Sequence, residues 1–148
     1  MPTIPPHETI HVGPVTVRYR LDASQTDGQF TMFEFRVPTG ARVPIAHSHD
    51  NFDETVYGLV GTMVWTVGGK EINVGPGEVL FIPRGIIHQF ENRSTTDTLS
   101  LSVITPGLLG PDYFREVSDV LKSAGPPDIA RIVGVMQRYG LRPVPPPA

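Results

Sequence analysis

Hydrophobic and polar residues alternate along most of the chain, in short runs that turn residues separate. A period of two predicts β-strands with one buried face, because successive strand side chains point to opposite faces. Residues 29–37 show this best, with Phe33, Phe35 and Val37 on one face. The other predicted strands are residues 15–21, 44–49, 54–60, 62–67, 70–74, 78–82, 87–92 and 98–105. About nine short strands at this spacing are typical of an all-β sandwich or barrel.

The hydrophobic period changes from two to about 3.6 after residue 108. Apolar residues then recur at helical spacing, with Pro111 suited to a first helical turn and Gly125 to a helix end. A second helix is predicted from about Pro127 to Tyr139. We therefore expect two short C-terminal α-helices after the strands.

The pattern divides the chain into four segments within one domain, as a length of 148 residues favours. Residues 1–12 form an N-terminal arm, and residues 13–108 form a β-barrel. Residues 109–141 form a helical segment, and residues 142–148 form a proline-rich tail. The chain contains no internal repeat.

Composition and charge exclude several classes of partner. The net charge is −3 and no basic patch is present, so we expect neither a nucleic-acid partner nor an anionic membrane surface. The chain has no cysteine, which excludes disulfides and thiolate ligands. No apolar run approaches the roughly 20 residues of a membrane span. Residues 1–6 lack the features of a signal peptide, so a cytoplasmic protein is expected.

Three histidines and a glutamate are the candidate chemical groups. A strand would place His47 and His49 on one side, because they are two residues apart. Glu54 and the distant His88 can complete a metal shell. Neutral imidazoles with one carboxylate suit divalent Fe, Mn, Ni, Cu or Zn, so we predict one such ion and a small-molecule metalloenzyme.

The spacing of these residues resembles the two motifs of the cupin superfamily. The first motif, H-x-H-x4-E-x6-G, matches at His47, His49, Glu54 and Gly61. The second motif, G-x5-P-x-G-x2-H-x3-N, matches at Gly77, Pro83, Gly85, His88 and Asn92. The one departure is that Gly40 precedes His47 by six residues where five are usual, which is a difference in loop length.

The resemblance implies both a fold and a set of metal ligands. The fold is a double-stranded β-helix, the jelly-roll barrel of cupins, here followed by the two predicted helices. The imidazole ligands would be His47, His49 and His88, and Glu54 would be the carboxylate ligand. Single-domain cupins commonly pair through sheet edges or outer faces, so a homodimer is expected.

Two charged neighbours of the motif residues have simpler interpretations. Asp53 could replace Glu54 as a ligand, but the six residues between Glu54 and Gly61 match the motif and favour Glu54. We expect Asp53 and Arg84 to be solvated turn residues. Asn92 is expected to bond a loop backbone.

A substrate pocket can be predicted from the parity of the strands. If Glu54 and His88 point inward, Val56 and Phe90 do so as well. The complete predicted lining is Phe33, Phe35, Val56, Met63, Trp65, Phe81 and Phe90. This lining is apolar and aromatic, and the absence of a predicted inward cluster of Arg or Lys argues against phosphosugar substrates.

The expected activity comes from the resemblance. A site of three His and one Glu looks like that of cupin dioxygenases, and the helices after the motifs resemble quercetinase-like proteins. In that chemistry Glu54 would be the catalytic residue, accepting a phenolic proton. The expected function is therefore dioxygenase-like oxidation of a small aromatic or enolisable compound. The alternatives are a lyase, isomerase or cyclase whose metal polarises a carbonyl, and a non-catalytic small-molecule-binding protein.

Overall fold

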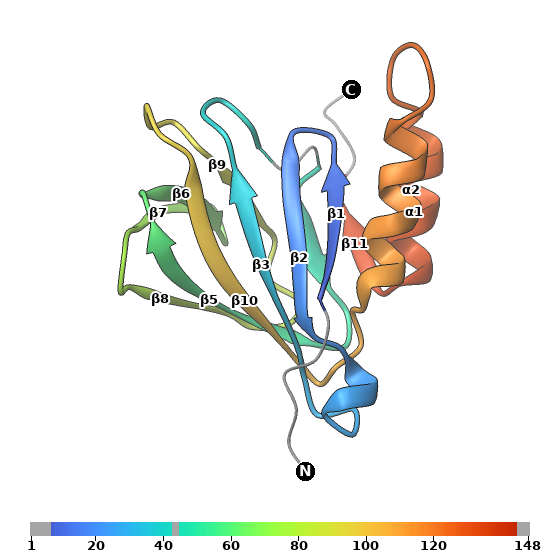
Figure 1. The fold of residues 1–148 in the computed structure, drawn as a ribbon, viewed down its shortest axis with the longest axis horizontal. Helices are drawn as coiled ribbons and strands as arrows, with labels where there is room; N and C mark the ends of the chain where they lie inside the picture. Colours follow the sequence, from blue (N-terminus) through green and yellow to red (C-terminus); the bar gives the residue numbers. More distant parts are fainter. Residues whose placement is uncertain (1–6, 43–44, 145–148) are drawn as a thin grey trace.

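Two antiparallel sheets enclose the core of the protein, and two helices lie at one end (Figure 1). The structure, a computed structural model, describes residues 7–42 and 45–144. The arrangement confirms the expected double-stranded β-helix. The core lies between the sheets and includes Trp65, Phe52 and Ile82, which are almost fully buried.

The first sheet has six strands in the order β1-β2-β3-β10-β5-β8. Their bounds are β1 Glu8–Val12, β2 Val15–Leu21, β3 Thr31–Val37, β10 Thr98–Thr105, β5 Asp53–Val60 and β8 Val79–Ile82. The second sheet has five strands in the order β11-β4-β9-β6-β7. Their bounds are β11 Leu141–Pro143, β4 His47–His49, β9 His88–Glu91, β6 Met63–Val67 and β7 Lys70–Val74.

Two strands of the sheets are formed by segments that the sequence analysis placed outside the barrel. Residues 8–12, expected to belong to an arm, form β1 and pair with β2. Residues 141–143 form β11 and pair with β4, although the proline-rich tail was expected to begin at residue 142. Pro143 is compatible with this position because β11 is an edge strand. The expectations for residues 1–6 and 145–148 lie outside the described residues.

The two predicted helices are present, as α1 Pro111–Leu121 and α2 Ile129–Arg138. Pro111 lies in the first turn of α1, and the side chain of Asp128 caps the start of α2 by accepting from the backbone N–H of Arg131. The helices pack on each other, α1 against β1 and α2 against β11 (Figure 1). Among the described residues, neither helix is long and apolar enough to cross a membrane.

Strand β10 carries its polar residues toward the core, which reverses the usual pattern. Ser100 and Ser102 are buried, while Leu99, Leu101 and Val103 are only partly buried on the outer face. Between two sheets filled with aromatic rings, small side chains fit at the centre of the sheet. The outer face is consequently rich in apolar groups.

Candidate metal centre

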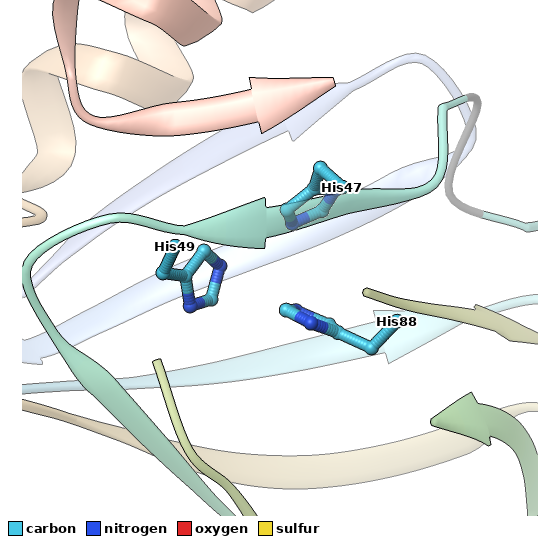
Figure 2. Close-up of side chains that lie close together, drawn as sticks. All are labelled: His47, His49 and His88. Atoms are coloured by element: carbon cyan, nitrogen blue, oxygen red, sulfur yellow. The ribbon is translucent and has the colours of Figure 1, made fainter. Parts of the chain in front are cut away.

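Strands β4 and β9 bring the three motif histidines together. His47 and His49 lie two residues apart on β4, and His88 is the first residue of β9. The two strands pair with His47 opposite His88. All three side chains are buried, and Figure 2 shows their rings facing a common point.

The spacing of the three imidazoles is compatible with one shared ion. Each histidine offers one ring nitrogen, and these nitrogens lie within 4.8 Å of one another. The ring centroids of His88 and His49 are 4.6 Å apart, and those of His88 and His47 are 4.7 Å apart. The ring of His49 also stacks on Phe52 with a centroid distance of 4.4 Å, which restricts its orientation.

Backbone carbonyls determine which nitrogen of two rings carries the proton. His47 Nδ1 lies 2.9 Å from the carbonyl oxygen of Ile45, and His88 Nδ1 lies 2.9 Å from that of Ile86. A carbonyl only accepts, so each Nδ1 donates and each Nε2 keeps its lone pair, as is usual for metal-binding histidines. His88 Nε2 is buried and has no hydrogen-bond partner among the described residues. A buried lone pair of this kind fits a metal ion.

The two oxygens of the buried Glu54 carboxylate have different partners. Oε2 accepts a hydrogen bond of 2.6 Å from Ser102 Oγ. Oε1 lies 3.7 Å from His88 Nε2 and 4.0 Å from His49 Nε2. Glu54 therefore presents Oε1 to the histidine cluster, while Ser102 holds the other oxygen.

Burial governs the protonation of the site. Desolvation, with repulsion from the neighbouring imidazoles, lowers the pKa of His47 to about 4 and that of His49 to about 2. Both rings are therefore neutral near pH 7, which is the form that binds metal. Burial raises the pKa of Glu54, while His88 and the hydrogen bond from Ser102 act in the opposite direction. A divalent cation would stabilise the charged carboxylate in this apolar setting.

Asp53 and Arg84, both expected to be solvated, pair with each other. Asp53 Oδ1 accepts from the Arg84 backbone N–H at 2.8 Å and from Nε at 3.2 Å, and Oδ2 accepts from Nη2 at 3.1 Å. The hydrogen bonds with Arg84 lower the pKa of Asp53. Asp53 thus points away from the histidines and ties the start of β5 to the loop before His88.

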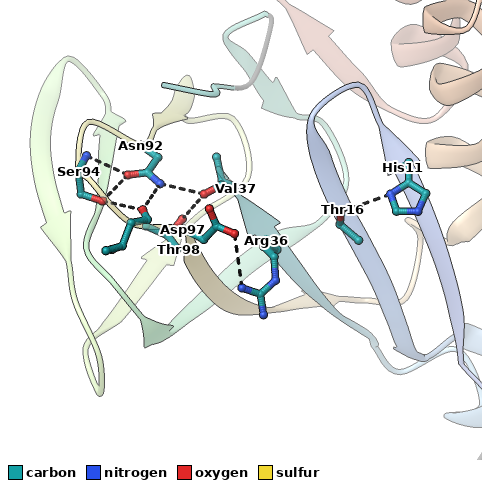
Figure 3. Close-up of polar contacts among 9 residues, drawn as sticks. His11, Thr16, Arg36, Val37, Asn92, Ser94, Asp97 and Thr98 are labelled. Carbon is teal, nitrogen blue, oxygen red and sulfur yellow. Dashed lines mark hydrogen bonds and ion pairs between the residues drawn. The ribbon is translucent and has the colours of Figure 1, made fainter. Parts of the chain in front are cut away.

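Asn92 bonds loop backbone, as the sequence analysis expected (Figure 3). Its Nδ2 donates to the carbonyl oxygens of Val37 and Thr96, both at 2.8 Å. Its Oδ1 accepts from the Ser94 backbone N–H at 2.9 Å. Asn92 therefore fixes the loop after β9 and has no contact with the site.

A cavity of about 240 Å³ contains the histidine cluster and Glu54 in its wall. Four predicted pocket residues line it, namely Phe33, Phe35, Trp65 and Phe90. Three others do not. Val56 and Met63 are buried in the core away from the cavity, and Phe81 is 56% exposed on the outer face. Phe81 points outward because its neighbour Ile82 pairs with Glu54 and faces inward.

Further cavity walls come from segments that the sequence analysis did not assign to the site. Both helices contribute, with Tyr113 and Val117 on α1 and Ile132 on α2. Arg42, in the loop before β4, also lines the cavity. The sequence showed that each helix has an apolar face, but it did not show that these faces line the cavity. Neither the strand periodicity nor the two cupin motifs in the sequence mark Arg42 or Ser102 as part of the metal centre or its cavity.

Comparisons of the sequence with known proteins identify a cupin domain that contains the three histidines and Glu54. The sequence pattern of a cupin domain matches residues 33–104. Quercetin 2,3-dioxygenase of Bacillus subtilis is 36% identical over 103 residues, which are 68% of this chain and 30% of that protein. An oxalate-binding protein of Thermotoga maritima is 30% identical over 93 residues, covering 62% of this chain and 76% of that protein.

Solved structures show the same fold. The crystal structure of a predicted oxalate decarboxylase from Thermotoga maritima superposes with a TM-score of 0.62 and 27% sequence identity. The superposition covers 68% of this chain and 91% of that one. The part of this chain that superposes covers most of that structure. The part that aligns with the dioxygenase covers only 30% of the length of the dioxygenase.

Proposed function

This chain belongs to the cupin superfamily, and we propose that it is a metal-dependent enzyme that oxidises a small aromatic or enolisable compound with O₂. The observation that carries the proposal is the cluster of three buried imidazoles beside Glu54, at the wall of an apolar cavity. The similarity to quercetin 2,3-dioxygenase supports the same reaction class.

The residues that would hold the metal are His47, His49, His88 and Glu54. The bound metal would supply a site that coordinates substrate oxygens and O₂ together. The chain's own contribution begins with Glu54, whose Oε1 faces the cluster and can accept the proton of a hydroxyl group. Ser102 holds Oε2, so the carboxylate cannot rotate freely.

The cavity favours a compact ring compound. Its volume of about 240 Å³ lies just below the roughly 300–1,000 Å³ of pockets for drug-sized ligands. Phe35, Trp65 and Phe90 form an aromatic wall, with centroids of Phe35 and Phe90 5.4 Å apart. Such a wall orients a flat ring and keeps water away from the part of the substrate that would react.

A second candidate is metal-dependent chemistry without O₂, such as a lyase reaction. The structural similarity to a predicted oxalate decarboxylase favours it. The similarity to an oxalate-binding protein likewise favours a third candidate, binding without catalysis. Oxygen consumption separates these candidates from the proposed reaction.

We predict that His49→Ala removes most of the bound metal, whereas Asp53→Asn does not. His49 contributes a ring nitrogen to the cluster, while Asp53 is engaged with Arg84. Elemental analysis of the purified proteins measures the metal content. Equal metal content in the two variants would contradict the assignment of the ligands.

The reaction class is tested with an oxygen electrode and a panel of catechols, flavonols and diketones. Metal-loaded native protein should consume O₂ with at least one of these compounds, and His49→Ala protein should not. Turnover of substrate without O₂ uptake would support the lyase or isomerase alternative. Binding without turnover would support the binding protein.

A further inference from the structure

We propose that the substrate carries a third oxygen, an uncharged hydrogen-bond acceptor, and that the hydroxyl group of Tyr113 donates to it. The inference rests on the proposed function, because it specifies the substrate of the same site. Tyr113 lies in the first turn of α1, lines the cavity and is only 8% exposed.

The hydroxyl group of Tyr113 is a buried donor without a partner. Within residues 7–42 and 45–144 it makes no hydrogen bond, and burial alone raises its pKa. Tyr19 differs, because its buried hydroxyl donates to the carbonyl oxygen of Leu109 at 2.8 Å. A buried hydroxyl without a partner costs free energy, so the Tyr113 hydroxyl gains from a ligand that accepts its proton in a hydrogen bond.

The free surface of this hydroxyl opens into the cavity. Packing completely covers three unpaired polar atoms of the described residues, namely Nδ1 of His49, Nε1 of Trp65 and Nε2 of His88. The Tyr113 oxygen is not one of them, so it retains free surface. Its raised pKa places that oxygen in the interior rather than at the outer surface. An interior oxygen with free surface faces a cavity, and Tyr113 lines this one together with Val117, one turn further along α1.

On one side, packing links Tyr113 to the strand that carries His49. The ring centroids of Tyr113 and Tyr139 are 5.5 Å apart. Leu141, two residues after Tyr139, pairs opposite His49. Tyr113, Leu141 and His49 all line the cavity.

On the other side, packing links Tyr113 to the residues around Glu54. The ring of Phe114 lies 4.9 Å from that of Tyr113 and 5.2 Å from that of Phe33, measured between centroids. Phe33 pairs opposite Ser102, which holds Glu54 Oε2. A ring with two oxygens toward the histidines can therefore extend a third oxygen toward Tyr113.

The surroundings favour an uncharged acceptor. The cavity wall near Tyr113 includes Phe33, Val117 and Ile132, which are apolar. A carbonyl oxygen loses less solvation free energy in such a wall than a carboxylate does. A site with a buried donor also rejects an analogue without the acceptor, because the donor then stays unpaired. The substrate class is thus a dihydroxylated ring that carries a carbonyl group.

The test compares acetylcatechols with ethylcatechols of nearly the same shape, each substituted at ring position 3 or 4. Zinc-loaded protein is used, because zinc does not change its redox state and binding can be measured without turnover. By calorimetry, Tyr113→Phe should bind at least one acetylcatechol roughly three- to tenfold more weakly than native protein. It should bind the matching ethylcatechol as native protein does. Comparing one compound between two proteins cancels the effect of the acetyl group on catechol acidity.

Tyr139→Phe is the matched control for binding. Tyr139 lies beside Tyr113, but its hydroxyl bonds the carboxylate of Glu116 and its side chain does not line the cavity. The control variant should bind all four compounds as native protein does.

Thermal unfolding of the ligand-free protein gives a second readout. Tyr113→Phe should unfold at the same temperature as native protein or a higher one, because it loses an unpaired buried hydroxyl. Tyr19→Phe should unfold at a lower temperature, because it loses the hydrogen bond to Leu109. A lowered unfolding temperature of Tyr113→Phe would show that its hydroxyl has a partner within the protein, and would overturn the inference.

The binding outcomes separate this inference from the proposed function. If Tyr113→Phe weakens neither acetylcatechol, or weakens each ethylcatechol equally, the role of Tyr113 is overturned and the proposed function stands. The same selective loss in Tyr139→Phe would also overturn that role. If native protein binds none of the four catechols, the proposed reaction on such compounds is overturned, and the role of Tyr113 with it.

Discussion

The two oxygens of Glu54 differ because, within residues 7–42 and 45–144, a hydrogen-bond donor contacts only one of them. Ser102, which is fully buried, donates to Oε2 at 2.6 Å. Oε1 is thereby left to face His88 and His49. Groups that orient a ligand commonly affect metal affinity as strongly as some ligands do.

We expect Ser102→Ala to weaken metal binding roughly tenfold or more, because Glu54 loses the donor that orients it. Competition with a chelator of known affinity measures the dissociation constant. Ser102→Thr should restore binding, since it keeps the hydroxyl group. Ser100→Ala is the matched control on the same buried face of β10. An equal loss of affinity in both alanine variants would contradict the specific role of Ser102.

The depressed histidine pKa values predict how the stability of the metal-free protein depends on pH. Burial holds the pKa of His47 at about 4 and that of His49 at about 2, below the roughly 6.5 of an unfolded histidine. The unfolded chain therefore binds more protons below pH 6.5, and the free energy of unfolding falls as the pH is lowered. Glu54, whose pKa is raised by burial, offsets part of this difference in bound protons. The free energy of unfolding should therefore rise with pH by less than about 2.7 kcal/mol per pH unit, the slope for two protons.

Urea unfolding of metal-free protein between pH 7 and pH 4 measures this slope. Metal-loaded protein is the comparison, because bound metal adds stability to the native state and dissociates as the ligands are protonated. A free energy of unfolding that stays constant down to pH 4 would contradict the neutral, buried state of the two rings.

At the scale of elements, α1 and α2 complete the cavity that the strands begin. α1 is tied to β1 through Arg115, which bonds Glu8, and to α2 through Glu116, which bonds Arg138. These ion pairs are exposed, so each contributes little to stability. Burial of Val117 and Ile132 does more to hold the helices against the cavity.

We predict that Ile132→Phe reduces catechol affinity without lowering metal content. Ile132 lines the cavity, so a larger ring takes up space that the ligand would use. Ile129→Phe is the matched control, because Ile129 lies on the same helix and is 46% exposed. Calorimetry gives the affinity and elemental analysis the metal content. A loss of affinity in the control, or none in Ile132→Phe, would show that α2 is not a wall of the binding site.

At the scale of the whole molecule, the outer face of the first sheet is unusually apolar. β8 is its edge strand, and Phe81 and Val79 are 56% and 61% exposed there. Tyr57, opposite Val79 on β5, is 40% exposed. Exposed apolar patches beside an open sheet edge are typical of protein interfaces.

We predict a homodimer in which this face contacts a second copy of the chain. Light scattering across working concentrations should give a dimer mass for the native protein. Phe81→Glu should shift the equilibrium toward the monomer, because a charge would be buried in the interface. Leu108→Glu, at a position that is 53% exposed, is the matched control and should leave the mass unchanged. A monomeric native protein would contradict the prediction.

Local pattern was enough to predict most elements and the candidate ligands. The period of two marked nine strands of the barrel, and the helical period marked α1 and α2. These features depend on neighbours in the sequence, so they can be read without the fold. The motif spacing likewise predicted that His47, His49 and His88 meet, with Glu54 beside them, as the structure places them.

What the sequence could not decide depends on which segments meet across the fold. β11 is a strand because a distant partner, β4, supplies its hydrogen bonds, whereas β1 forms a hairpin with the adjacent strand β2. Ser102 reaches Glu54 from another strand, and the loop before β4 carries Arg42 to the cavity wall. The hydrophobicity of Phe81 did not predict the direction of its side chain. Phe81 points outward because of the register between β5 and β8. Local periodicity determines the elements, and the resemblance to the cupin motifs identifies the candidate ligands, whereas tertiary pairing determines the cavity around them.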